Sequence, residues 1–529
     1  MLKAKVTRLF DELGGIKQAS RSMHPKKMFC LSLVLCAAVT AGAQQQQPMN
    51  TPLVEGAREP RILTLQECIQ LALAHNLEIQ VQQYNPLINE FALGINYAYY
   101  EPALGFRASH NFNSSPGGIN PATGQPFPPN ERSTDTYVPE LSGFLPTGLS
   151  FDITGPLSKQ TGTSVPLSTK YSSDPGITLR QPLLKNLWID TPRLQIQLGK
   201  NAIKGSEVVL LGQVMTTVTS VQQAYYELVF ARENVKVQAA ALELAEQLLA
   251  ENRKRVEVGA LAPLDEKQAE SQAAANRATL LLTQRQELAQ ENTLKSLLTD
   301  NYNEWVNISP VPSEGLLAIP QELNLQESWR LALAKRPDIL EQKLTLERQN
   351  ITVKYNFNQL FPTVDVTGSY GRNALNATFG GNLDDIRTGN NPFYSYGVVV
   401  SIPLGNGAAR NAYKAAKASA RQFLLQLKLL EQAAIVTVEN DVAQVRTDLQ
   451  TITARREARI YAESALEAEQ KKLANGKSTS FIVLQLQINL TTARSTEIRA
   501  LADYNEHLAQ LALDEGSTLD KNHIDFKVK

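Results

Sequence analysis

The most constraining feature of this sequence is a long internal repeat. The segment LQECIQLALA at 65–74 returns as LQESWRLALA at 325–334, 260 positions later. The register then holds without a gap as far as Pro102 and its counterpart Pro362. A repeat of this length exceeds the 20–50 residues of a solenoid module, so it marks a duplicated half-protein. We therefore expect both halves to build the same succession of elements.

Each half opens with a helical segment that is followed by strands. The first helical segment begins after Thr64 and is expected to break near His75, because the matching place in the second half holds Pro337. Alternation of apolar and polar residues then predicts strands at about 103–113, 175–184, 363–373 and 393–404. One face would carry Leu104, Phe106, Val364, Val366, Val398 and Val400. The other face would carry Arg107, Ser109, Asp365 and Thr367.

The segment 113–175 between the first two strands is 39 residues longer than its counterpart. It contains a further alternating run at Leu149, Phe151 and Ile153. An extra strand, an extracellular cap and a plug are all compatible with this pattern.

Very long helices follow the strands in both halves. Within 192–258, apolar residues recur every seven positions, at Val214, Val221, Leu228, Val235, Leu242, Leu249 and Val256. A sustained seven-residue period predicts left-handed coiled-coil packing. The segment 407–475 repeats the pattern, and both segments end at a glycine turn, at 258–265 and 475–482. Return helices are expected at about 263–300 and 480–515.

Composition and the N-terminus narrow the class of protein. Lys and Arg number 52, as do Asp and Glu, so a basic nucleic-acid-binding surface is not indicated. Residues 1–43 read as an export signal with an N-terminal extension, because the apolar run 28–39 precedes a small-residue cleavage site. Initiation at Met1 or Met23, and lipid attachment at Cys36, stay open.

Neither an enzyme nor a metal protein is indicated. Cys68 is the one cysteine beyond the signal, and the histidines are scattered, so no disulfide, cofactor or metal site is expected. The run Gly405-Asn406-Gly407 lacks the third glycine of a dinucleotide loop.

Four predicted strands cannot close a barrel in one chain, and open edges are not tolerated in lipid. If the strands span a membrane, several chains must share a barrel, and three chains would supply twelve strands. A soluble sheet with one packed face has the same alternation. A periplasmic coiled-coil structural protein is the alternative function, and a diffusion porin would need more strands.

The chain resembles the TolC-like outer membrane efflux proteins, the outer membrane factors of tripartite pumps, over nearly all of 62–515. The resemblance rests on LTLQECIQLALAHN, QPLL, IPLG, VGALAPLDEKQAE and GKSTSFIVLQLQ, in this order and with this duplication. It implies an α+β membrane protein that forms a homotrimer, with a 12-stranded outer-membrane β-barrel continued by a 12-helix periplasmic α-barrel. It also implies a passive exit duct of a tripartite efflux pump or type I secretion system in a Gram-negative-type bacterium. The implied partners are outer membrane lipid, a periplasmic adaptor (membrane fusion protein) and an inner-membrane RND or ABC transporter. The cargo and the energy source of the pump stay open.

The resemblance places candidate sites at the two glycine turns. Adaptor docking would fall on Val258, Gly259, Ala260, Leu261, Asn475, Gly476, Lys477 and Ser478. The family closes this tip with inward polar and acidic residues after the second turn. Here the positions aligned with the acidic pair hold Ile482 and Gln485, and Asp265 after the first turn is the remaining acidic candidate, so the candidate constriction consists of Asp265, Ile482 and Gln485.

The expected domain order follows from these assignments. A signal at 1–43 and a linker at 44–61 precede the first repeat at 62–305. A linker at 306–322, the second repeat at 323–515 and a tail at 516–529 complete the chain.

Overall fold

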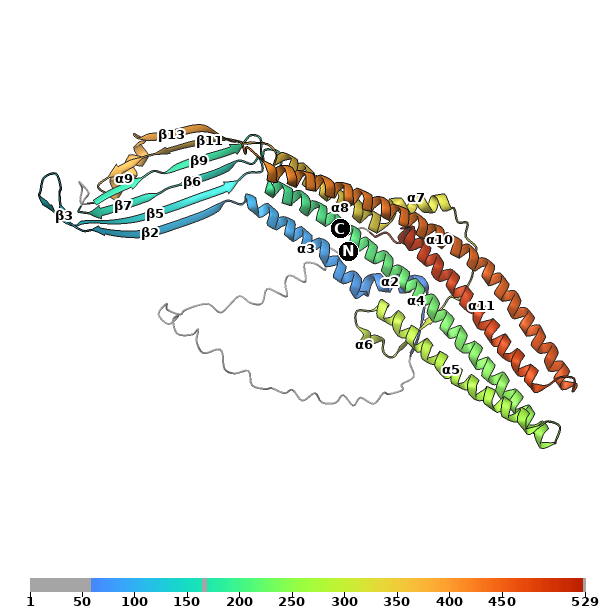
Figure 1. The fold of residues 1–529 in the computed structure, drawn as a ribbon. Helices are drawn as coiled ribbons and strands as arrows, with labels where there is room; N and C mark the ends of the chain where they lie inside the picture. The colour runs from blue at the N-terminus through green and yellow to red at the C-terminus, as the bar shows by residue number, and fades with distance from the viewer. Residues whose placement is uncertain (1–58, 164–168, 527–529) are drawn as a thin grey trace, which may run out of the picture. The chain divides into compact units, whose positions relative to one another are not determined.

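The computed structural model describes residues 59–163 and 169–526. The predicted signal at 1–43 and nearly all of the linker at 44–61 lie outside the described residues. A β-sheet and a set of long helices form two successive parts of the described chain, with the helices continuing from one end of the sheet (Figure 1).

The same order of helices occurs in both halves. The first half contains α2 (Leu65–His75), α3 (Leu77–Tyr97), α4 (Thr191–Glu257) and α5 (Pro263–Leu298). The second half contains α7 (Leu325–Lys335), α8 (Pro337–Asn358), α10 (Gly407–Ala474) and α11 (Ser480–Asp514). Shorter helices are η1 (Ala98–Tyr100), α6 (Tyr302–Trp305), α9 (Phe379–Thr388) and α12 (Thr518–Lys521). In the first half α3, α2 and α5 lie one after another along α4, and in the second half α8, α7 and α11 lie one after another along α10 (Figure 1).

Side-chain caps define where the paired short helices start and stop. Thr64 and Glu67 form a capping box at the start of α2. Asn76 ends α2 and caps α3, since its side-chain oxygen accepts from the backbone N–H groups of Glu78 and Ile79. The predicted break near His75 is therefore present.

The long helix α4 supplies the core of the first half. Its heptad residues Val214, Val221 and Leu228 are fully buried against α2, α3 and α5. Toward the C-terminal end of α4, the buried residues are instead Ala241, Ala245 and Leu248, which form a buried seam along the helix. The heptad positions in this part are only half-buried.

Within the described residues the sheet has nine strands, which exceeds the predicted four. The strands are β2 (Ala103–Ser115), β5 (Asn130–Phe144), β6 (Ser150–Thr154), β7 (Leu157–Gly162), β8 (Thr169–Ser173), β9 (Gly176–Pro182), β11 (Thr363–Arg372), β12 (Ala374–Asn376) and β13 (Pro392–Ser401). A separate small hairpin pairs β3 (Gly118–Ile119) with β4 (Pro126–Phe127).

Several of these strands are consecutive pieces of one longer run. β6 and β7 both pair with β5, and the Gly155 N–H between them still donates to the Pro139 carbonyl at 3.0 Å. β8 and β9, and likewise β11 and β12, follow one another in the same way. The sheet is thus an antiparallel meander of six runs, from β2 through β5, β6–β7, β8–β9 and β11–β12 to β13.

The prediction of two strands in the first half is therefore wrong. Of the three possibilities for its long connection, added strands are present, because 130–162 adds two complete runs between β2 and β9. The count of four strands per chain, from which twelve in a trimer followed, is wrong for the same reason. Alternation alone revealed only the piece around Phe151, since the polar and glycine-rich stretches beside it resemble loops.

Strand register separates two chemically different faces. One row of directly opposed residues crosses all six runs: Leu104, Leu141, Ile153, Ile177, Tyr370 and Tyr394. The neighbouring row on the opposite face reads Ala103, Ser142, Asp152, Thr178, Ser369 and Ser395. The predicted valines share the first face with Leu104 and Phe106, and Asp365 shares the second with Arg107. An apolar face and a polar face thus cross all six runs at the end of the sheet nearer the helices. Farther out, the first face also carries the opposed residues His110, Asp135 and Lys159.

The segments predicted as linkers contain structure that the sequence did not reveal. β1 (Glu59–Leu63) pairs in parallel with β10 (Ile308–Pro312), so the ends of both linkers meet. The Leu63 carbonyl accepts from the Ser313 N–H and from the Tyr225 hydroxyl, which fastens this pair to α4.

Candidate functional site

The two helical hairpins end in the same backbone motif. After α4, the Gly259 N–H donates to the Val256 carbonyl at 2.9 Å and the Ala260 N–H to the Arg255 carbonyl at 2.7 Å. After α10, Gly476 and Lys477 make the equivalent pair of bonds, at 3.1 and 2.9 Å. This double bond pattern with a left-handed residue is the Schellman motif.

Both glycines are required by backbone conformation. Gly259 has φ of +74° and Gly476 has φ of +67°, a region that other residues enter only with strain. No atom lies within 4 Å of where a Cβ would stand at either glycine. The turns are therefore open on the outside, and Val258 is 79% exposed beside the first of them.

The predicted docking residues lie at these two turns, which belong to different halves of the chain. Ala260, Asn475, Gly476 and Lys477 are exposed, and Leu261 is half-buried. Ser478 is half-buried because its hydroxyl bonds Glu469 at the end of α10. That hydrogen bond, helped by Lys472, lowers the pKa of Glu469.

Asn252 links the two hairpins and was not predicted from the sequence. Its side-chain oxygen accepts from the Ser480 hydroxyl at 3.0 Å, and its amide nitrogen donates to the Asp265 carbonyl at 3.3 Å. Asn252 is 1% exposed, so both of these bonds are shielded from water. Its spacing could have revealed it, because Asn252 lies four residues after Leu248 and seven after Ala245, on the same buried side of α4.

A second contact between the hairpins comes from Arg255. Its guanidinium reaches the Leu473 carbonyl at 3.5 Å, and it also pairs with Glu251 on its own helix. Within the first hairpin, Arg253 pairs with Glu266 at 3.3 Å. Ends of helices from both repeats are thus held together by side chains of α4.

The predicted constriction residues are divided between the hairpins. Asp265 lies half-buried in the first turn of α5, whereas Ile482 and Gln485 are exposed in the first turns of α11. Gln485 donates to Asn489 on its own helix at 3.2 Å. Among the described side chains, none of these three candidates hydrogen-bonds another.

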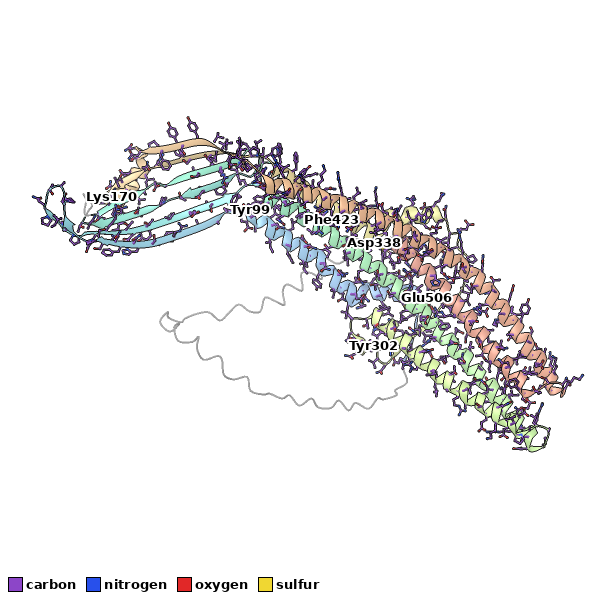
Figure 2. All side chains as sticks on the ribbon, viewed as in Figure 1. Tyr99, Lys170, Tyr302, Asp338, Phe423 and Glu506 are labelled. Atoms are coloured by element: carbon purple, nitrogen blue, oxygen red, sulfur yellow. The ribbon has the colours of Figure 1, made fainter. Side chains whose placement is uncertain are left out.

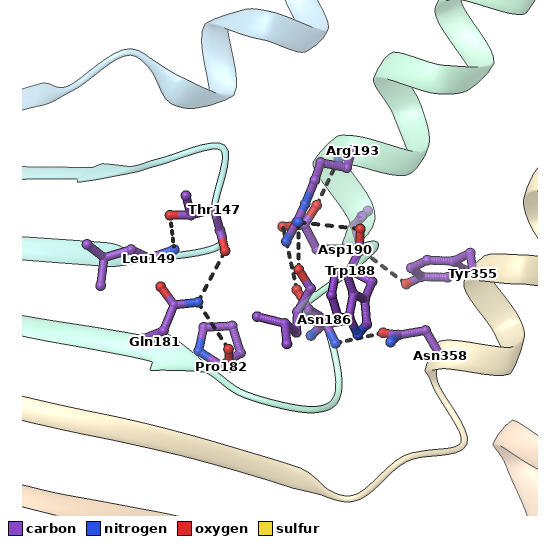
Figure 3. Close-up of polar contacts among 12 residues, drawn as sticks. Thr147, Leu149, Gln181, Pro182, Asn186, Trp188, Asp190, Arg193, Tyr355 and Asn358 are labelled. Atoms are coloured by element: carbon purple, nitrogen blue, oxygen red, sulfur yellow. Dashed lines mark hydrogen bonds and ion pairs between the residues drawn. The ribbon is translucent and has the colours of Figure 1, made fainter.

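At the other end of the helices, a polar junction fixes them to the sheet. The Asn186 N–H donates to the Asn358 side chain at 2.7 Å, and the Asn186 carbonyl accepts from Arg193 at 2.8 Å (Figure 3). Arg193 also pairs with Asp190, the N-cap of α4. These hydrogen bonds connect the start of α4 to the end of α8. They therefore join the two repeats at the place where the helices meet the sheet.

An ionic cluster joins α4 to α11 between these two ends. Arg499 of α11 contacts Glu227 of α4 as well as Asp503 at 2.6 Å and Glu506 at 3.0 Å on its own helix. Burial raises the pKa of Glu506 to about 7, against the opposing effect of Arg499 and with a further increase from Glu227. Figure 2 marks Glu506 on the helical part, far from Lys170 on the sheet.

Within 59–163 and 169–526, no helix combines the length and apolarity of a membrane-spanning helix. Across the same residues, no three His, Cys, Asp or Glu side chains are grouped as metal ligands.

Comparison with known proteins yields one family. A sequence profile described as outer membrane efflux protein matches residues 157–299 and 329–514. The outer membrane efflux protein BepC of Brucella suis is 22% identical over 355 residues, which cover 66% of this chain and 74% of BepC.

Solved structures share the fold. The Campylobacter jejuni CmeC outer membrane channel superposes with a TM-score of 0.62 at 16% identity, over 86% of each chain. The Vibrio cholerae outer membrane protein VceC gives 0.62 at 18% identity, over 85% of this chain and 96% of VceC. The resemblance and the outer-membrane location predicted from the sequence are thereby confirmed, and the chain belongs to the outer membrane efflux protein family.

Proposed function

We propose that this protein is the homotrimeric exit duct of a tripartite efflux pump or type I secretion system. In this proposal it carries substrates passively across the periplasm and the outer membrane. An inner-membrane RND or ABC transporter supplies the energy, and a periplasmic adaptor joins that transporter to the duct. The observation that carries the proposal is a continuous sheet with one apolar and one polar face at the end nearer the helices. Its two outer edges have no partner strand among the described residues.

The unpaired edges favour association of identical chains. Among the strands that the structure describes, β2 pairs with β5 alone and β13 with β11 alone, so each edge offers free backbone groups over its length. Such edges are not tolerated in lipid unless another strand covers them. Head-to-tail pairing of β13 with β2 of the next copy leaves no free edge when the ring closes. With six runs per chain, a trimer would contain an eighteen-stranded barrel in place of the expected twelve.

The helices at the two outer sides of the helical part, α3 and α10, also favour contact between identical chains. On the side of α3 that faces away from α4, exposed apolar residues recur at helical spacing, at Val81, Tyr84, Ile88, Phe91 and Ile95. On the side of α10 that faces away from α8, exposed Leu425, Leu429 and Val436 form a second stripe. An apolar surface of this kind marks an interaction site. In the proposed ring, the stripe on α10 of one copy would pack against the stripe on α3 of the next copy.

Docking of the adaptor is proposed at the two open turns. Their backbones are accessible, because no side chain occupies the space beside Gly259 or Gly476. Three copies would present six such turns in a ring. Cysteines placed at Ala260 and Lys477 should crosslink to the adaptor in intact cells, whereas a cysteine at exposed Arg455 on the body of α10 should not.

For the constriction, we propose that Asp265, Ile482 and Gln485 narrow the tip of the assembled trimer. Replacing Asp265 and Gln485 by alanine should raise single-channel conductance. Unchanged conductance in both variants would exclude these residues as the narrowest point.

The deciding experiment is the native mass of the detergent-extracted protein, followed by conductance in planar bilayers. Three copies per particle with single-channel currents support the exit duct. A monomer, or a trimer without currents, contradicts it.

A further inference from the structure

The start of α10 carries an isolated basic surface. Between 407 and 430 this helix holds five lysines and arginines and no aspartate or glutamate, in a chain whose total charge is balanced. Four of the five, named here the basic row, are Arg410, Lys414, Lys417 and Arg421. Their spacing of four, three and four residues places them on one face of the helix. All four are exposed and, within the described part of the chain, none has a carboxylate at ion-pair distance.

The direction of the basic row follows from the hand of the sheet. The Val364 carbonyl accepts from the Leu183 N–H at 2.7 Å, so it points toward β9. We view the sheet from its apolar face with the helices below, so that β11 runs upward and the Val364 side chain faces the viewer. In an upward strand of L-residues, the carbonyl of a residue whose side chain faces the viewer points to the right. Seen from the apolar face with the helices below, β9 therefore lies to the right of β11 and β13 to its left. The helix α8, which leads into β11, then lies to the right of α10.

The packing of α10 completes this orientation. Ala416 is buried toward α8, and its carbonyl accepts from Gln349 of α8 at 3.2 Å. Lys417 is one residue further, about 100° around a right-handed helix that runs downward. This turn brings Lys417, and the basic row with it, to the viewer's side. The basic row therefore faces the same side as the apolar face of the sheet.

The basic row also lies close to that apolar face along the chain. Only 402–406 separates the last residue of β13 from α10, so Arg410 is within about 5 Å along the helix axis of its start and Arg421 within about 21 Å. Ile402 and Leu404 in the connection are exposed, Leu404 completely. From the sheet toward the helices, exposed apolar side chains are thus followed by exposed cations. A membrane changes over a similar depth from hydrocarbon to lipid headgroups.

A groove beside the basic row combines both kinds of contact. It has a volume of about 380 Å³ and is lined by the four basic side chains together with Leu360 and Tyr413. Leu360, two residues beyond the end of α8, and the ring of Tyr413 supply apolar contacts, and the four cations supply charge. Such a groove suits an amphiphile that carries a negative group.

Neighbouring helices add cations at the same level. Lys354 lies near the end of α8, and Lys200 and Lys204 lie near the start of α4, all three exposed. Lys200 follows Gly199, which packs against Leu93 of α3, and Asn201 reaches Glu347 of α8. Lys200 therefore projects between these two contacts, on the same side as the basic row.

We propose that the basic row binds the phosphate groups of anionic phospholipids in the membrane leaflet on the helix side of the sheet. This inference rests on the proposed placement of the sheet in the outer membrane. Lysines and arginines bind phosphate by charge-assisted hydrogen bonds. Each cation at a membrane surface strengthens binding to anionic lipid by roughly fivefold at low salt. The acyl chains of the bound lipid lie toward Leu360 and the apolar face.

The test compares two triple variants of the full-length, detergent-extracted protein. The first, Arg410→Gln with Lys417→Gln and Arg421→Gln, removes three charges of the basic row. The control, Lys254→Gln with Arg285→Gln and Arg455→Gln, removes three exposed charges from the parts of α4, α5 and α10 that lie away from the sheet. Native mass spectrometry then counts bound phosphatidylglycerol and phosphatidylcholine at equal concentrations. Planar-bilayer conductance of each variant is recorded in parallel.

We expect the wild type and the control to retain phosphatidylglycerol over phosphatidylcholine, and the basic-row variant to lose this preference at least tenfold. Equal loss of both lipids, or an unchanged preference in the variant, would overturn the proposal. Glycerol phosphate added at the lipid concentration should not displace phosphatidylglycerol; displacement would show a phosphate site without a role for the membrane. Absence of channel currents in the wild type would overturn the exit duct, whereas an unchanged lipid preference in conducting particles overturns only the role of the basic row.

Discussion

The side chain of Asn252 accepts a hydrogen bond from the hydroxyl of Ser480 at 3.0 Å, across hairpins that belong to different repeats. Because its amide also donates to the Asp265 carbonyl, one buried residue holds α4, α5 and α11 at the tip. Any opening of the tip that separates the hairpins must break this contact.

Replacing Asn252 by alanine should loosen the tip. The Ser480 hydroxyl and the Asp265 carbonyl lose a shielded partner, which costs about 1–3 kcal/mol of local stability. Amide hydrogen exchange should accelerate in the first turns of α5 and α11. Asn234→Ala is the matched control, because Asn234 accepts from Ser495 at 2.8 Å farther from the tip. Equal acceleration at the tip in both variants would contradict the role of Asn252.

Alanine at Gly259 or Gly476 should destabilise its own turn by about 1 kcal/mol, since a Cβ strains the left-handed conformation. Free space around both sites means that strain is the whole effect. Gly205→Ala, in the interior of α4, should instead stabilise by about 0.5–1 kcal/mol. Thermal unfolding measures both effects, and a stabilised Gly259→Ala protein would refute the argument.

Glu506→Gln should raise stability at high pH and have little effect at low pH. The folded-state pKa of about 7 exceeds the ordinary value of 4.5, so folding favours the protonated carboxyl. Its contribution is therefore fully present below about pH 4.5 and is lost as the pH rises toward 7. Glutamine remains neutral throughout. Midpoints of thermal unfolding at pH 5 and pH 8 should differ less in the variant; the same difference as in the wild type would contradict the shift.

The two faces of the sheet should respond differently to a charge. Leu179→Arg places a cation on the apolar face and should cost about 2–4 kcal/mol if that face contacts lipid at the bilayer midplane. Thr178→Arg, one residue earlier, places the same cation on the polar face beside Asp152 and should be tolerated. Heat-dependent gel mobility of the folded protein in detergent reports the outcome. Comparable losses in both variants would contradict the assignment of the faces.

Removal of 130–162 should narrow the duct through the membrane. This deletion takes out β5, β6 and β7, and it returns the chain to the predicted four runs. Barrel diameter grows roughly linearly with strand number, so the cross-section should fall to about half. Deleting 118–127 instead removes the small hairpin of β3 and β4, which lies outside the sheet, and should leave conductance unchanged. Equal conductance in both deletions would exclude the wider barrel.

The sequence predicted the elements whose signal is local. Heptads identified the long helices, the repeat identified matching elements in both halves, and glycines located both tip turns. Each of these patterns is contained within one helix or one turn. The family resemblance also followed, because it depends on the order of such local patterns.

Features that depend on pairing between distant segments were not predicted. The additional runs at 130–162 have many polar residues on both faces, and only register against β2 and β9 shows that they are strands. Asn252 was missed because a single polar residue in a long helix resembles a solvated position until its partners on α5 and α11 are known. The docking residues named from the sequence stay predictions.

The parallel pair of β1 and β10 has a consequence for the order in which the chain folds. In the described structure Glu59–Leu63 pairs with Ile308–Pro312, so this pairing must wait for the segment that follows the last long helix of the first repeat. Closing so long a loop is entropically costly, and its cost falls once α4 and α5 have packed and shortened the path. The strand that precedes the first repeat therefore pairs only after the whole repeat has been made. A chain truncated before residue 308 would lack β10, the strand with which β1 pairs.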